Sequence, residues 1–117
     1  MKKKYYPSFP LYPKDFLSSI DVQTMTVEEV GAYCLLMFNS WIQEDQCYLP
    51  DDEKTLKVLS KLDGKKWEKY SPKVLKKFKK KNKKIFNPRL VRELKNRQNY
   101  SKTQSEKGKK GGRPVKS

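Results

Sequence analysis

One stretch, TVEEVGAYCLLMFNSWI from Thr26 to Ile42, constrains the fold of this chain most. Its apolar residues fall at helical spacing on one side, and the opposite side is nearly as apolar. The residues of the first side are Val27, Val30, Cys34, Met37, Phe38 and Trp41, and those opposite are Tyr33, Leu35, Leu36 and Ile42. Such a helix needs burial from several directions, which predicts the central helix of a compact domain. Thr26 and Glu29 form an S/T-x-x-E capping box at its start. Gly31 costs a helix about 1 kcal/mol relative to alanine, so we expect another element to pack closely there.

The charge of the chain is divided unevenly between its halves. The 117 residues carry a net charge of +15. Residues 1–63 hold 7 Lys and Arg against 10 Asp and Glu, whereas residues 64–117 hold 21 against 3. This asymmetry is typical of a protein that meets a polyanion with one side. The alternative is a solubilising or non-specific, histone-like charge.

Several protein classes are disfavoured by the composition. No apolar run approaches the about 20 residues of a membrane span, and the first 20 residues lack the apolar core of a signal peptide. Cys34 and Cys47 stand 13 residues apart in a chain without histidine, so we predict no metal site, no disulfide scaffold and an intracellular protein. With no Gly-rich phosphate loop and no nucleophile–base pair, we predict no catalytic residues, no cofactor and no enzyme. The acidic cluster at residues 51–53 is interpreted as helix capping.

Residues 1–25 are predicted to form an arm. Lys2 to Lys4 are basic, and a segment of interleaved aromatics and prolines follows. The prolines hold this segment extended, and Pro13 suits the first turn of a short helix through Ser18. The residues expected to point inward from it are Phe16, Leu17 and Ile20. We expect the segment to wrap over the core, although aromatics beside lysines can also stack on nucleic-acid bases. Buried side chains at Tyr5, Tyr6 and Tyr12 would favour a clamp, and exposed ones a protein partner.

A short strand and two further helices are predicted after the central helix. The strand covers residues 47–49 and is closed by Pro50, and Asp51 or Asp52 caps the next helix, which ends at the turn of residues 63–64. Its inward stripe is Leu56, Leu59 and Leu62. The following helical segment runs from about residue 65 to 78 with Trp67, Tyr70, Val74, Leu75 and Phe78 inward. Because Pro72 is unfavourable inside a helix, we prefer two helices, the second with Ser71 as its N-cap, over one kinked helix.

The last elements predicted are a lysine-rich hairpin and a helix. Asn82-Lys83 is the turn, Ile85-Phe86 is prone to form a strand, and a helix begins near Arg89 with Leu90, Val91 and Leu94 inward. Residues 101–117 are predicted to be a flexible basic tail.

This order of helix, short strand, helix, helix, hairpin and helix is that of a winged helix, a helix-turn-helix variant with a β-hairpin wing. The predicted fold is therefore mainly α with a small β-hairpin, with the winged-helix domain at residues 26–100. Lysines gather on its third helix, its wing and its tail, which are the places from which such a domain reaches duplex DNA. The predicted nucleic-acid contacts are Lys65, Lys66, Lys69, Lys73, Lys76, Lys77, Lys79, Lys80, Lys81, Lys83, Lys84, Lys107, Lys109, Lys110 and Arg113.

The expected contact is electrostatic. Lysine supplies point charge for phosphates and little base readout, so affinity should fall steeply with salt. Two rivals stay open: an RNA-binding basic protein, and a protein-interaction module that uses the acidic first half or the segment of residues 5–12.

The chain resembles the YdaU-like family of phage and prophage proteins, whose domain stands at the N-terminus of phage replication-initiation proteins. The residues that carry the resemblance are Tyr5-Tyr6-Pro7, the Phe9 to Phe16 run, Met25 to Glu29 with Gly31-Ala32-Tyr33, Leu49 to Asp52, and Ser105 to Pro114. The resemblance implies a winged-helix-like fold and a role on phage DNA in a bacterial host cell, at its nucleoid, as an origin binder or a recruiter of helicase and primosome. It implies no enzyme, and homodimers are common among winged-helix proteins. Members often continue into a linker and a second domain, so the chain is either a fragment or a short stand-alone version.

Overall fold

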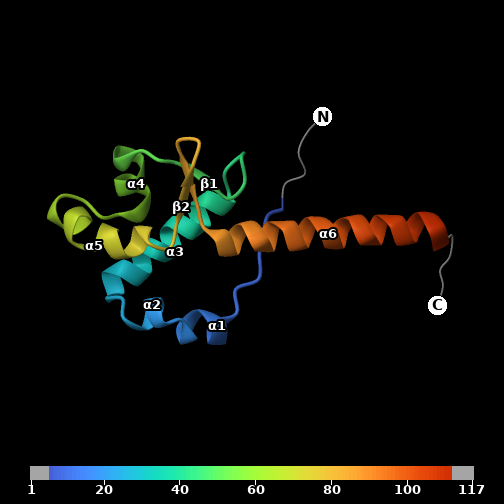
Figure 1. Cartoon of the computed structure of the whole chain (residues 1–117), viewed down its shortest axis with the longest axis horizontal. Helices are drawn as coiled ribbons and strands as arrows, with labels where there is room; N and C mark the ends of the chain where they lie inside the picture. The colour runs from blue at the N-terminus through green and yellow to red at the C-terminus, as the bar shows by residue number, and fades with distance from the viewer. Residues whose placement is uncertain (1–5, 112–117) are drawn as a thin grey trace.

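Helix α3 (Val27–Trp41) crosses the part of the molecule from which the long C-terminal helix projects, and two helices and a strand pack against it (Figure 1). The structure is a computed structural model that describes residues 6–111, with side chains for residues 6–100. The elements in chain order are α1 (Pro13–Ser18), α2 (Ile20–Gln23), α3 (Val27–Trp41), β1 (Tyr48–Pro50), α4 (Glu53–Ser60), α5 (Lys65–Leu75), β2 (Lys79–Lys81), β3 (Lys84–Phe86) and α6 (Pro88–Gly111). The fold is mainly helical with a small antiparallel sheet, as the sequence predicts.

The start of α3 confirms the predicted capping box. The Glu29 N–H donates to Thr26 Oγ1 at 3.1 Å, and the Thr26 N–H donates to Glu29 Oε1 at 2.8 Å. Two amide groups that the helix itself cannot satisfy are thereby bonded. The chain therefore enters the central helix at a fixed residue.

Burial of α3 is less complete than we expected. Its core face consists of Ala32, Tyr33, Leu36, Met37 and Trp41, and it packs against α4, α5 and β1. The outer face stays open: Val27 is 86% exposed, and Phe38 and Ile42 are exposed as well. The expectation of a close neighbour at Gly31 is wrong, because nothing lies within 4 Å of a Cβ built there. The thin N-terminal segment covers only part of α3, through ring contacts such as Phe9 on Trp41, so the described residues leave one side of the helix uncovered.

The pair α4 and α5 differs from the prediction at one point. Of the two predicted caps, Asp51 and Asp52, it is Asp52 that caps α4, by accepting from the Thr55 N–H at 3.1 Å. The preferred split at Ser71 is wrong, because α5 continues through Pro72. Trp67 and Val74 lie on both sides of the proline and are buried in the same core, which holds the two turns in line. Pro72 itself is exposed, so water can reach the carbonyl that lacks its usual intrahelical donor.

The small sheet has the order β1-β3-β2 with antiparallel neighbours. The hairpin of β2 and β3 confirms the predicted turn: Asn82 and Lys83 have φ of 50° and 62°, as a two-residue type I′ turn requires. The pairing of β1 with β3 places Leu49 opposite Ile85, and both side chains are buried. The hairpin is thereby attached to the core through β3, the middle strand of the sheet.

The N-terminal segment confirms one inward residue and corrects two. Phe16 is buried and stacks on Tyr33 with ring centroids 5.8 Å apart. Leu17 and Ile20 are 62% and 77% exposed, and Val22 is buried in their place. The six residues of α1 and four of α2 are separated by Ser19, so no continuous helical stripe links them.

Helix α6 begins at Pro88 and extends away from the other elements (Figure 1). Leu90 is buried and Val91 and Leu94 are partly buried, as predicted. The helix continues past residue 100, where we expected a flexible tail to begin, as far as Gly111. Mobility of the tail stays a prediction, and residues 112–117 lie outside the described part.

Candidate nucleic-acid interface

Three lysines form an exposed row on α5, which we call the α5 ridge: Lys65, Lys69 and Lys76. Their spacing of four and seven residues puts them on one side of the helix, opposite the buried Trp67 and Val74. Lys66 is also exposed beside the ridge. No ion pair to any of these lysines is found among the side chains of residues 6–100. The ridge therefore offers uncompensated positive charge.

Two predicted contact residues, one on α5 and one in the turn after it, are directed to the N-terminal segment instead. Lys73 Nζ donates to the carbonyl oxygen of Thr24 at 2.6 Å. Lys77 Nζ lies 3.1 Å from Asp21 Oδ2 and 5.9 Å from the centre of the Tyr33 ring. Both lysines are partly buried and bonded within the molecule, so the structure does not bring them to the ridge.

The hairpin carries its lysines in two environments. Lys79, Lys81 and Lys83 are exposed. Lys80 Nζ lies 3.4 Å from Asp51 Oδ2, and Lys84 Nζ lies 2.7 Å from Asp45 Oδ2. These ion pairs are solvent-accessible and hence weak, about 0 to 1 kcal/mol, so a phosphate could replace the carboxylate. Backbone positions of Lys107, Lys109 and Lys110 fall on α6, their side chains lie outside the described part, and so does all of Arg113.

A cleft of about 280 Å³ lies between α2, the end of α5 and the start of α6. Lys76, Lys77, Arg89 and Arg92 line it together with Asp21. Sequence reasoning missed Arg89 and Arg92. Their spacing of three residues, directly after the Asn87-Pro88 helix start, was the available signal, because it puts both on one side of the first turns of α6.

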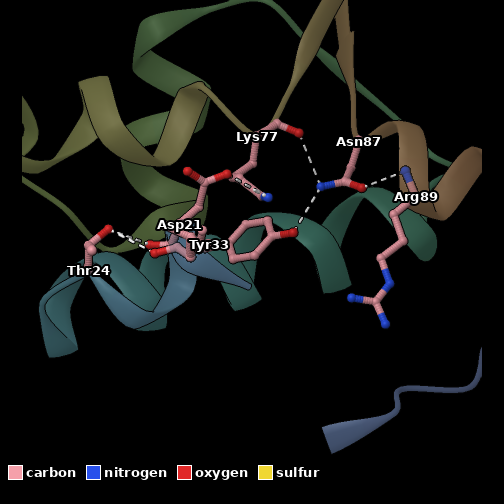
Figure 2. A network of polar contacts seen from close by, with 7 residues as sticks. Asp21, Thr24, Tyr33, Lys77, Asn87 and Arg89 are labelled. Carbon is pink, nitrogen blue, oxygen red and sulfur yellow. Dashed lines mark hydrogen bonds and ion pairs between the residues drawn. The ribbon is translucent and has the colours of Figure 1, made fainter. Parts of the chain in front are cut away.

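A buried asparagine holds the walls of this cleft together (Figure 2). Asn87 Nδ2 donates to the Tyr33 hydroxyl and to the Lys77 carbonyl oxygen, each at 3.2 Å. Asn87 Oδ1 accepts from the N–H groups of Arg89 and Leu90 at 2.9 and 3.3 Å, as a helix N-cap does. Figure 2 shows the Arg89 guanidinium extending away from this network.

The N-terminal tyrosines, whose burial would favour a clamp and whose exposure would favour a protein partner, differ from one another. Tyr6 is buried, and its N–H and carbonyl oxygen bond Gln46 at 3.2 and 2.6 Å, which is a clamp. Tyr12 is 52% exposed, and Tyr5 lies outside the described residues. An apolar groove of about 360 Å³ lies beside this segment, between Phe9, Leu11, Phe38, Trp41 and Ile42.

Three further observations on the described residues concern metal ligands, thiols and membrane-spanning helices. No three His, Cys, Asp or Glu side chains of that part lie together as metal ligands would. Burial raises the pKa of the half-buried Cys34 thiol, which disfavours the reactive thiolate. Among the helices that the structure describes, none combines the length and the apolar character needed to span a membrane.

Comparison with known proteins places the chain in a family. The model of the family described as "Protein of unknown function (DUF1376)" matches residues 5–95, so the chain belongs to that family. The same comparison found no curated protein and no solved structure that matches the chain.

Proposed function

We propose that this member of the DUF1376 family binds duplex DNA as a winged-helix protein. In this proposal α4 and α5 are the helix-turn-helix, α5 enters the major groove, and the β2–β3 hairpin is the wing on the backbone. The three-stranded arrangement, with β1 pairing β3 along its full length, is compatible with that fold. The proposal keeps the ridge, Lys66 and the hairpin lysines as contact residues and assigns Lys73 and Lys77 to internal contacts.

One observation carries the proposal. The α5 ridge and the hairpin tip present exposed lysines with no ion pair in residues 6–100, while the carboxylates of Asp21, Asp45 and Asp51 are bonded to other lysines. A surface whose positive charge is left uncompensated stays available for phosphates. Each neutralised phosphate releases counterions, so binding should depend steeply on salt. Lysine fixes position more than it reads bases, so sequence preference should be modest.

A role in phage replication is part of the proposal and rests on the resemblance to phage initiation proteins alone. On that role the protein would act in the cytoplasm of a bacterial host, at the nucleoid, with a replication protein as partner. A homodimer would present two such basic surfaces to one duplex.

A protein-interaction module is the second candidate function. The apolar groove favours it, because Phe38 and Ile42 are exposed on α3 and Trp41 lines the groove. The buried Nε1–H of Trp41 finds no acceptor among the described residues. A partner that inserts an apolar side chain would fill the groove between Phe38 and Ile42.

Binding of labelled nucleic acids tests the two functions. A duplex DNA, a single strand and an RNA duplex are titrated at about 50 and 200 mM salt, the interval over which phosphate-dominated affinity falls by orders of magnitude. The variant Lys79→Gln/Lys81→Gln/Lys83→Gln is compared with Lys14→Gln/Lys54→Gln/Lys95→Gln, which removes three exposed lysines elsewhere. Salt-sensitive duplex binding that only the hairpin variant loses supports the proposal. Absence of binding at the lower salt contradicts it and directs attention to the groove, and preference for the RNA duplex would assign an RNA partner.

A further inference from the structure

The cleft at the start of α6 has an excess of positive charge. Lys76, Lys77, Arg89 and Arg92 line it, and Asp21 is its one acidic residue. Asp21 is engaged by Lys77 at 3.1 Å, which leaves three cations without an ion pair among the described side chains. Phe16, Val22 and Pro88 line it as well, while Lys76 and Arg92 are exposed to water. Several cations that converge on one anion bind it more strongly than one exposed lysine does.

The Asn87 network fixes the backbone at the start of α6, the helix that carries Arg89 and Arg92. Asn87 is only 2% exposed, and its side chain bonds α3, the turn that follows α5 and the first turn of α6. The N–H groups of Arg89 and Leu90 already donate hydrogen bonds to its Oδ1. An anion in the cleft would therefore be met by side chains and not by the free amides of the helix terminus.

The choice of arginine at this cleft is informative. The chain has 24 Lys and 4 Arg, and two of the four arginines line this one cleft. The guanidinium fork donates two parallel hydrogen bonds to a phosphate, whereas an ammonium acts as a point charge. No ion pair to Arg89 or Arg92 is found in the part of the chain whose side chains are described.

We propose that this cleft binds a phosphate group through Arg89, Arg92 and Lys76. If the proposed function holds, this phosphate group is a backbone phosphodiester of the bound duplex; the assignment rests on that function. Lys76 belongs both to the cleft and to the α5 ridge, so a strand that contacts the end of the ridge lies within reach of the cleft. The cleft would hold the duplex in one register against α5, which the lysines by themselves do not specify.

Arginine side-chain NMR signals test the proposal on the whole chain. The Nε–Hε signals are followed while inorganic phosphate, and separately a duplex DNA, is added. We expect saturable shifts of Arg89 and Arg92 with both ligands, and weaker, non-saturating shifts of Arg97, which lies farther along α6. Phosphate shifts without any duplex binding would contradict the proposed function and leave the cleft with a free phosphate compound as its ligand. Duplex binding without selective shifts of Arg89 and Arg92 would contradict the assignment of the cleft as a phosphate site, but it would not contradict the proposed DNA-binding function. Absence of duplex binding together with absence of phosphate shifts would overturn both proposals.

Variants give an independent readout. Arg89→Gln/Arg92→Gln should weaken duplex binding about tenfold and reduce the slope of log K against log salt by about 1, as loss of one phosphate contact requires. Arg89→Lys/Arg92→Lys keeps the charge but removes the fork, so it should retain the slope and still lose affinity. The matched control is Lys95→Gln/Arg97→Gln on the same helix. Equal losses in the cleft and control variants, with folded spectra for both, would overturn the proposal.

Discussion

Asn87 and Tyr33 are 54 residues apart in sequence, yet the amide Nδ2 of Asn87 donates to the hydroxyl of Tyr33 at 3.2 Å in the protein interior. Both side chains are 2% exposed. The same nitrogen lies 3.2 Å from the carbonyl oxygen of Lys77. One side chain thus fixes the start of α6 to α3 and to the end of α5, and so aligns the hairpin between them.

Removal of this side chain should destabilise the protein. Asn87→Ala deletes the cap of α6 and leaves the buried Tyr33 hydroxyl without this donor, so the free energy of unfolding should fall by about 2 to 3 kcal/mol. Urea denaturation measures this change in the free energy of unfolding. Asn96→Ala, at an exposed position of the same helix, is the control and should stay within about 0.5 kcal/mol of wild type. Equal stabilities of the two variants would contradict this role of Asn87.

Pro72 interrupts the hydrogen bonding of a continuous helix. Because alanine restores an N–H for the Glu68 carbonyl and fits an exposed helical position, Pro72→Ala should raise the free energy of unfolding by about 1 to 2 kcal/mol. Thermal or urea unfolding gives the value. Pro88→Ala at the first position of α6, where proline is tolerated, should give no gain. A loss in Pro72→Ala would indicate that the chain does break at residue 71.

The hairpin turn can be stabilised at the cost of one lysine. Lys83 has φ of 62°, a conformation that glycine adopts without strain and that type I′ turns favour at this position. Lys83→Gly should therefore raise the free energy of unfolding by about 1 kcal/mol. In contrast, Lys81→Gly inside β2 should lower it by about 0.5 to 1 kcal/mol. The opposite order would contradict the turn geometry.

Acid should reduce the contribution of the α4 cap. Hydrogen bonds from the Thr55 hydroxyl and then from its N–H lower the pKa of the Asp52 carboxyl below its ordinary value. The folded state therefore favours the carboxylate, and its contribution is present above the ordinary pKa and lost as the pH falls through the lowered one. Asp52→Ala should be less stable than wild type near pH 7, and the difference in urea midpoint should narrow below about pH 4. A difference that is constant with pH would contradict a charged cap.

Local signals predicted much of the fold. The capping box of α3, the cap at Asp52 and the Asn82-Lys83 turn each depend on residues within three positions, and all three are confirmed. Pro72 is the case in which a local rule fails, because buried Trp67 and Val74 on both sides hold α5 together. The open outer face of α3 depends on which elements the chain has left to cover it, which periodicity does not reveal.

The candidate site was less accessible to sequence reasoning. The partners of Lys73 and Lys77 are 49 and 56 residues away in the chain, and no periodicity links those positions. Arg89 and Arg92 were overlooked because the dense lysines of the hairpin dominate the charge pattern. Their importance depends on a cleft that only the packing of α2 against α5 and α6 creates.

The α5 ridge is tested most directly by the salt dependence of duplex DNA binding. The variant Lys65→Gln/Lys69→Gln/Lys76→Gln is compared with Lys14→Gln/Lys54→Gln/Lys95→Gln, which has the same net charge. If the ridge neutralises phosphates, the slope of log K against log salt should fall in magnitude by about 2 to 3 in the ridge variant and little in the control. Equal slopes for the two variants would contradict the proposed DNA-binding role of α5.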